Sequence, residues 1–301
     1  MTGAEPQEET PQTPGFVAQL TAYSNIIAPA SVITALLFYF GYLATRARFE
    51  YFGVYLDLVN LSTPDLLLYG SDVVFVPITL VAFTVLVAFS LRLAGQWLVS
   101  EPRRDTLSGW ITLTVLLVAV LLLLKALVGI LVPSVSREES PGVTPLSLTL
   151  GALLLRYSAS LWQTLAARRP RPTWMPPREG INVGRYALLS LIVAGLFWAA
   201  NSFAFVYGNG RALDDVDGLT KRPAVTLYSH DLVDDPPQGV VHTVLPGKEK
   251  FRHRYTGLRL LVESDKRLFL VPAPWSPDTS RTLVIENSSD IRLQLVPPTP
   301  G

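Results

Sequence analysis

Long apolar runs separated by short polar segments dominate the first two thirds of the chain. The clearest run extends from Tyr186 to Tyr207 without a charged residue, and a helix of about 20 apolar residues crosses the hydrocarbon layer of a membrane. The pattern predicts an α-helical membrane bundle over 26–207. Its five predicted transmembrane helices cover about 26–44, 73–91, 107–132, 146–167 and 186–207.

The segment 146–167 is amphipathic, and whether it fully spans the membrane stays open. Thr149, Arg156 and Gln163 are spaced by seven residues and therefore share one helical face. A charge at the bilayer centre costs about 2.5 to 3.5 kcal/mol, so Arg156 is expected to face protein, water or the interface. One hypothesis is an anion or substrate pathway lined by Arg156. The favoured hypothesis is a polar helix face that packs inward or lies at the interface.

Lys125 joins Arg156 and Gln163 as a candidate polar residue within the membrane. It lies in the last third of the run 107–132, from where the long lysine stem lets the ammonium group reach the interface. Asp72 is its expected partner.

Topology is predicted from the arginines that flank the spans, because positively charged loops stay in the cytoplasm. With a cytoplasmic N-terminus, only Arg46, Arg48 and Arg137 lie in outer loops. The count therefore predicts a protein of the cytoplasmic membrane with an extracytoplasmic C-terminal domain. The inner flanks then hold Arg92, Arg103, Arg104, Arg168, Arg169, Arg171, Arg178 and Arg185.

Two polar segments border the first span. Residues 1–25 form an acidic, proline-rich tail that is expected to be disordered. Residues 48–72 are expected to form an interfacial elbow with a short helix starting at Thr63; a lid or a partner-binding collar is the less favoured alternative. The elbow contains aromatic residues of the kind that settles at the headgroup level, namely Phe49, Tyr51, Phe52, Tyr55 and Tyr69.

From Arg211 onward, apolar and polar residues alternate with period two between turn residues. The pattern predicts a small all-β domain over 208–301, either a barrel or a sandwich. A hairpin turn is expected at Ser264–Lys266 and a bulge at Gly257. Strands are expected near 224–229, 239–245, 252–263, 267–271, 280–286 and 291–296.

The elbow and the stretch GLRLLVESDKRLFLVP at 257–272 resemble uncharacterised actinobacterial multi-pass membrane proteins with a C-terminal extracytoplasmic β domain. The resemblance implies the same architecture and carries no activity with it.

Candidate chemistry is sparse. The chain has no cysteine, which excludes disulfides and thiolate metal sites. Its three histidines, His230, His242 and His253, are spread over the β domain, and sequence spacing does not show that they converge. No catalytic residue, metal site or cofactor is therefore predicted.

The stretch KEKFRHRY at 248–255 is the candidate ligand-binding ridge. As a strand it would place Lys250, Arg252 and Arg254 on one face. Such a ridge could bind an anionic envelope polymer or lipid headgroups. The favoured explanation is a charged edge strand that prevents aggregation.

Composition narrows the function classes. Hydrophobic residues make up 49% of the chain and charged residues 16%, and the net charge is only +1, so a single soluble globule is excluded and nucleic acid is not an expected partner. We expect a non-enzymatic binding, sensing or assembly module of the bacterial cell envelope, embedded in the lipid bilayer with a protein partner or further copies of itself. The alternative is a small transporter or channel subunit with Arg156 near its pathway.

Overall fold

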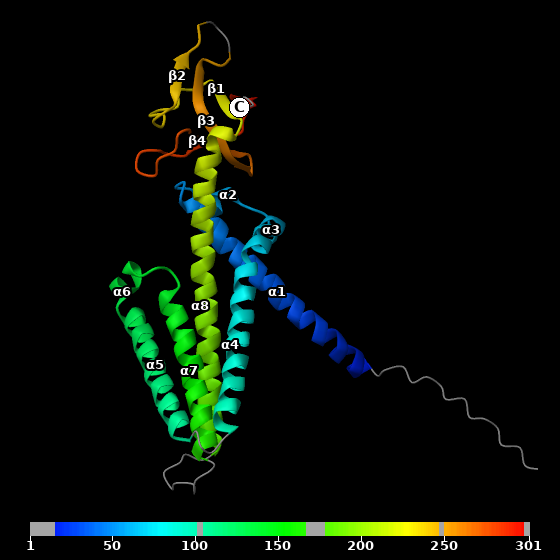
Figure 1. The fold of residues 1–301 in the computed structure, drawn as a ribbon. Helices are drawn as coiled ribbons and strands as arrows, with labels where there is room; N and C mark the ends of the chain where they lie inside the picture. Colours follow the sequence, from blue (N-terminus) through cyan, green and yellow to red (C-terminus); the bar gives the residue numbers. More distant parts are fainter. Residues whose placement is uncertain (1–15, 101–104, 167–177, 247–249, 298–301) are drawn as a thin grey trace, which may run out of the picture.

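The computed structural model describes residues 16–100, 105–166, 178–246 and 250–297 of the 301-residue chain. This part is mostly helical, and an antiparallel β-sheet follows the last long helix (Figure 1). Helix α1 begins at Phe16, before the predicted start of the first span at residue 26. The rest of the predicted acidic tail, 1–15, lies outside the described residues.

Five long helices build the helical part of the described residues (Figure 1). They are α1 (Phe16–Glu50), α4 (Phe75–Ser100), α5 (Asp105–Leu131), α7 (Val143–Ala166) and α8 (Arg178–Gly218). Shorter elements join them, namely α2 (Leu56–Val59), α3 (Thr63–Val73), α6 (Pro133–Glu138) and the 3-10 turn η2 (Leu219–Lys221). Helix α3 lies where expected, but the hydroxyl that caps it belongs to Ser62, in a capping box with Asp65, and not to Thr63, which is already helical.

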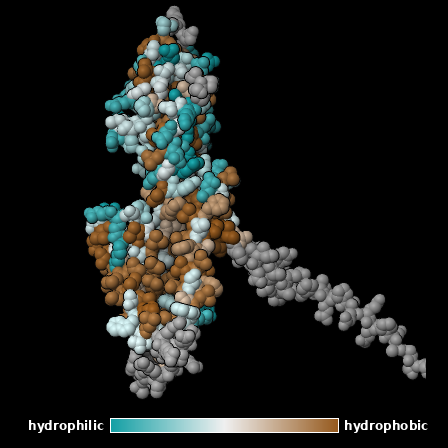
Figure 2. All heavy atoms as spheres, viewed as in Figure 1, coloured by the Kyte–Doolittle hydropathy of each residue, from teal (hydrophilic) through white to brown (hydrophobic). Residues whose placement is uncertain are grey.

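Four helical segments in the described part are long and apolar enough to cross a membrane: Ala30–Glu50, Phe75–Leu98, Thr106–Leu131 and Asn182–Lys221. Hydrophobic residues cover the helical part of the surface, while hydrophilic residues gather around the β-sheet (Figure 2). Both features indicate a membrane protein. Helix α7 is not among the four segments, so a fifth span is not confirmed.

Helix α7 packs against α5 and α8 (Figure 1), and several of its polar residues are buried in this packing. Ser147, Thr149 and Ser158 are buried, whereas Leu146 and Leu150 are exposed. The buried hydroxyls donate to backbone carbonyls of their own helix, so burial leaves these donors satisfied. Buried hydroxyl groups beside exposed leucines in this part of α7 suit a helix surrounded by lipid.

Small residues form the contact where helices α1 and α8 cross. Ala200, Ala204, Gly208 and Ala212 recur every four positions on α8 and are buried. At the crossing a Cβ added to Gly208 would overlap the backbone oxygen of Ala44 on α1. Small residues that permit such close backbone contact are typical of helix packing in membranes.

The β-sheet consists of β1 (Ala224–Ser229), β2 (Val241–Val244), β3 (His253–Ser264), β4 (Arg267–Pro272), β5 (Leu283–Glu286) and β6 (Ile291–Val296). Their order is β5-β4-β3-β1-β6, with β2 also paired to β3, and all pairs are antiparallel. The predicted strands 224–229 and 291–296 match β1 and β6, and the others overlap the observed strands. The predicted domain start at 208 falls inside α8, which continues to Gly218.

Strand β3 is bent. Gly257 has φ +90°, and the register between β1 and β3 shifts beside it, which confirms the expected bulge. Asp265 and Lys266 have positive φ in the tight turn between β3 and β4, which confirms the hairpin. Only 287–290 join β5 to β6, although these strands stand at opposite ends of the strand order, so the sheet must curl. The pairings describe one curled sheet, and neither a closed barrel nor a two-sheet sandwich is confirmed.

Candidate functional site

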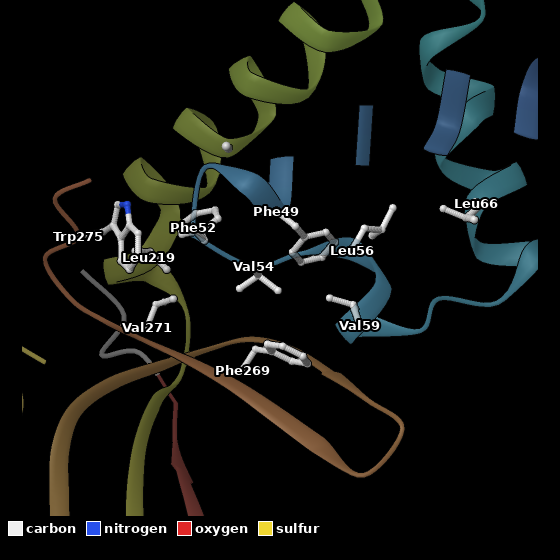
Figure 3. Close-up of a cluster of buried hydrophobic side chains, with 11 residues drawn as sticks. Phe49, Phe52, Val54, Leu56, Val59, Leu66, Leu219, Phe269, Val271 and Trp275 are labelled. Atoms are coloured by element: carbon white, nitrogen blue, oxygen red, sulfur yellow. The ribbon is translucent and has the colours of Figure 1, made fainter. Parts of the chain in front are cut away.

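The junction between the helices and the sheet is organised by β4, which is buried on both faces. Leu268 and Leu270 belong to the core enclosed by the curled sheet. Phe269 and Val271 point the other way, into a second core that the sheet shares with the helical part (Figure 3). Alternate residues of a strand face opposite sides, so one strand serves both cores.

We call the second core the junction core. The elbow between α1 and α3 contributes to it, and Phe52 lies against Trp275 with ring centroids 5.0 Å apart (Figure 3). Burying a large apolar side chain contributes roughly 1.5 to 3 kcal/mol, so several of them give a firm attachment. The buried members of the junction core are Phe49, Phe52, Val54, Leu56, Val59, Leu66, Ala212, Leu219, Phe269, Val271 and Trp275.

The junction core corrects the expectation that the aromatic residues of the elbow lie at the headgroup level. Phe49 and Phe52 are 4% and 1% exposed and contact the β-sheet rather than lipid. Tyr55 and Tyr69 are exposed, as the expectation requires. Aromatic rings suit an interface and a protein core equally well, so the sequence did not distinguish the two environments.

A charged cluster reinforces the same junction. The Asp215 carboxylate of α8 accepts two hydrogen bonds from Arg48 of α1, with N–O distances of 2.5 and 2.9 Å, and one from Arg222 at 2.6 Å. The Asp215 side chain is only 10% exposed, while those of Arg48 and Arg222 are 23% and 29% exposed. Such charge-assisted, partly buried bonds tie both helices to the segment that leads into β1.

Two further hydrogen bonds fasten the sheet to this end of the bundle. The Thr282 hydroxyl donates to the Phe52 carbonyl at 2.5 Å, and Arg259 Nε donates to the Leu219 carbonyl at 3.0 Å. They connect the β5 side of the sheet to the elbow, and β3 to η2, which directly follows α8. The β domain is therefore docked on the helices and not merely tethered to them.

The sequence contained a signal for this docking. Ala200, Ala204, Gly208 and Ala212 are spaced by four residues, and Asp215 follows Ala212 by three. Both spacings keep successive residues on one side of a helix. That periodicity shows that α8 remains helical and in contact beyond the apolar run. The prediction ended the span at Tyr207 and began the β domain at 208, so it missed this continuation of the helix.

Arg156 is half-buried on α7, and Gln163 is exposed nearer the end of that helix. Along the predicted shared face, exposure therefore increases from buried Thr149 to exposed Gln163. Among the described residues, no hydrogen bond or ion pair involves Arg156. A shallow pocket between α5, α6 and α8 does not include it; the pocket is lined by Gly129, Ile130, Pro133, Ser136, Arg137 and Trp198.

Lys125 is paired with Glu139, so the prediction that Asp72 is its partner is wrong. The ammonium group lies 2.9 and 3.0 Å from the two Glu139 carboxylate oxygens, and the Thr144 hydroxyl donates to the same carboxylate at 3.0 Å. The hydrogen bond from Lys125 is the main reason why the pKa of Glu139 is lowered. The lysine reaches out of the α5 span as expected. Its partner Glu139, however, lies in the connection between α6 and α7.

The candidate ridge is not one continuous strand face, because β3 begins only at His253. Lys250 precedes the strand and donates to the Ser289 carbonyl at 2.6 Å, with Asp290 at 3.5 Å. Arg252 is exposed, and Arg254 is half-buried within β3. Lys250, Arg252 and Arg254 therefore lie in different surroundings and do not form the predicted ridge.

A different row of side chains crosses the strands at the same end of the sheet. Tyr228 of β1 pairs directly with Arg254 of β3 and with Arg292 of β6. Sequence reasoning missed it because the three residues lie far apart along the chain and only the strand order makes them neighbours.

Two of the three histidines meet. His242 Nε2 and His253 Nδ1 are 3.0 Å apart, and the His242 ring stacks on Tyr255. His230 instead contacts the Lys250 carbonyl through Nδ1 at 2.8 Å. Over the described residues, no group of three metal-ligating side chains forms.

No protein-family model, curated protein or solved structure matches this chain.

Proposed function

We propose that this chain is a multi-pass integral membrane protein that presents a small extracytoplasmic β domain and acts as a non-enzymatic binding, sensing or assembly module of the bacterial cell envelope. The observation that carries the proposal is the docked junction: Phe52, Trp275 and Phe269 share one core, and Asp215 holds Arg48 and Arg222. A domain that only needed anchoring would require no buried interface. A docked domain holds its surface at a constant orientation and passes force or displacement to α1 and α8.

The proposed topology has five crossings, with α7 as the fourth. Its buried hydroxyl groups explain why this helix is less apolar than α5, and its length of 24 residues suffices to span. With five crossings the N-terminus lies on the cytoplasmic side and the β domain on the outer side of the cytoplasmic membrane. A protein partner or a second copy in the membrane, together with the bilayer, completes the proposed assembly.

Cysteine labelling tests the orientation. The chain has no cysteine, so Ser288→Cys and Thr173→Cys introduce single sites into a clean background. Ser288 lies in the connection between β5 and β6, and Thr173 lies between α7 and α8 in the chain. We expect a membrane-impermeant thiol reagent, applied to intact cells, to label the Ser288→Cys variant and not the Thr173→Cys variant. The reason is that arginine-rich flanks stay on the cytoplasmic side of the membrane. The reverse pattern would place the β domain in the cytoplasm and refute the proposal.

The second candidate function is a small transporter or channel subunit, favoured by the half-buried Arg156, which has no carboxylate partner within the described residues. We expect Arg156→Leu to yield more inserted protein than the natural chain, because removal of a charge from the membrane recovers about 3 kcal/mol. Quantitative membrane fractionation measures the inserted amount.

Arg156→Gln is the matched variant, since it removes the charge but keeps a polar side chain. A pathway would make Arg156→Gln lose uptake of a labelled anion while its insertion stays intact. Loss of folded protein in Arg156→Leu would contradict the expected gain in inserted protein. It would show that the guanidinium group holds the bundle together.

A further inference from the structure

The outward face of the sheet carries one row of polar and aromatic side chains, which we call the arginine–tyrosine row: Arg254, Tyr228 and Arg292. Directly paired residues of antiparallel strands lie on the same face about 5 Å apart. The alternate residues Val225 and Leu227 of β1 are buried in the core of the sheet, so the row faces away from that core.

An aromatic ring extends the row at its Arg292 side. The Arg292 guanidinium carbon lies 5.7 Å from the centre of the Phe251 ring, and Lys250 Nζ lies 5.9 Å from the same centre. Arg254 and Arg292 thus flank Tyr228, and a second ring follows. Aromatic rings beside cations form a surface for a ligand that has both rings with an apolar face and negatively charged groups.

The arginines of the row have spare binding capacity. No carboxylate pairs with Arg254 or Arg292 in the described part of the chain, whereas Arg281 is paired with Asp235. Arg254 Nε is buried and makes no hydrogen bond there. An unpaired buried donor is costly, and a guanidinium fork fits a carboxylate or phosphate group with two parallel bonds. The unpaired guanidinium groups of Arg254 and Arg292 are therefore suited to bind an anion.

The position of the row distinguishes among anionic partners. The sheet lies beyond the end of α8 (Figure 1), and α8 rises about 16 Å from Tyr207 to Gly218 at 1.5 Å per residue. Screening limits the reach of exposed charges to roughly 8 Å at physiological salt, so with the predicted span ending at Tyr207 the headgroups of the protein's own membrane are expected to lie out of range.

We infer that the arginine–tyrosine row binds an acidic polysaccharide on the outer side of the membrane. Arg254 and Arg292 hold its carboxylate or phosphate groups, and Tyr228 and Phe251 lie against its sugar rings. The inference rests on the proposed function, since it assigns a ligand class to the displayed β domain.

Binding to the full chain in nanodiscs of neutral phosphatidylcholine tests the inference. The probes are polygalacturonate for carboxylate groups, phosphomannan for phosphate groups and neutral dextran as the uncharged sugar polymer. The natural chain is expected to bind at least one acidic probe and not dextran. Arg292→Gln is expected to weaken that binding about tenfold, because a charge-assisted hydrogen bond is lost.

Lys266→Gln is the matched control, since it removes one exposed charge at the β3–β4 turn, away from the row. Its affinity is expected to stay within about twofold of the natural chain. Arg292→Lys keeps the charge and loses the fork, so an intermediate affinity is expected. Arg292 is exposed, and its variants therefore decide the matter even if Arg254→Gln fails to fold.

Equal binding by Arg292→Gln and Lys266→Gln would overturn the inference, because it would show unspecific charge attraction. Tighter binding of a single-stranded oligonucleotide than of both acidic sugars would also overturn it, in favour of a nucleic acid. No binding of either acidic probe would overturn it as well. The cysteine labelling at 288 does not depend on these binding outcomes, so the proposed function can stand when this inference falls. A labelling pattern that places the β domain in the cytoplasm would refute the proposed function whatever the binding result.

Discussion

Asp215→Ala is expected to lower the stability of the docked state by about 2 to 3 kcal/mol, because Arg48 and Arg222 lose their shared carboxylate while they remain partly buried. The two arginines would then repel each other across the space that the carboxylate occupied. Thermal unfolding in detergent measures the loss. Limited proteolysis between α8 and β1 is expected to become faster, since this segment passes through the weakened junction.

Asp214→Ala is the control for this change. Asp214 is the neighbouring residue, its side chain is 70% exposed, and its pair with Arg211 spans 3.8 Å on one helix. Such an exposed pair contributes about 0.5 kcal/mol or less, so the variant should behave like the natural chain. Equal stability of Asp214→Ala and Asp215→Ala would show that the charged cluster does not hold the junction.

Gly208→Ala is expected to destabilise the crossing of α1 and α8 by about 1 to 3 kcal/mol, the usual cost of inserting a methyl group into a packed interior. The added Cβ would overlap the backbone oxygen of Ala44, and backbone does not give way as a flexible side chain does. The helices must therefore separate, which also moves Asp215 away from Arg48. Thermal unfolding, together with disulfide trapping of cysteines placed across α1 and α8, measures both effects.

Gly210→Ala is the matched control two residues further along α8. No atom lies within 4 Å of a Cβ added there, and alanine favours a helix over glycine by about 1 kcal/mol. This variant is expected to be as stable as the natural chain or more stable. If both substitutions stabilise the protein, the close contact between α1 and α8 does not contribute to the fold.

The strands were predictable because their information is local. Alternation of apolar and polar residues located β1 and β6, and Ser264–Lys266 and Gly257 marked the turn and the bulge. The position of helix α3 was also predictable to within one residue, although Ser62 rather than Thr63 caps it. The four apolar helices were predictable for the same reason, since hydropathy along one segment needs no knowledge of its neighbours.

Contacts between distant segments were not predictable in this way. Lys125 lies closer along the chain to Glu139 than to the expected Asp72, yet only the return of α6 and the start of α7 toward α5 brings the carboxylate to it. Arg254 and Arg292 become neighbours of Tyr228 only through the strand order. The candidate ridge failed as a unit because Lys250 and Arg252 precede β3.

The sequence by itself determined the division into a helical membrane part and a C-terminal β part, because hydropathy and periodicity act over a few neighbouring residues. Only the tertiary structure decided that the two parts are docked. Phe49 and Phe52 are equally compatible with a headgroup region and with a protein core, and the choice depends on whether Phe269 and Trp275 arrive from more than 200 residues away. Burial energy comes from a surface that two segments share, so neither segment specifies it alone.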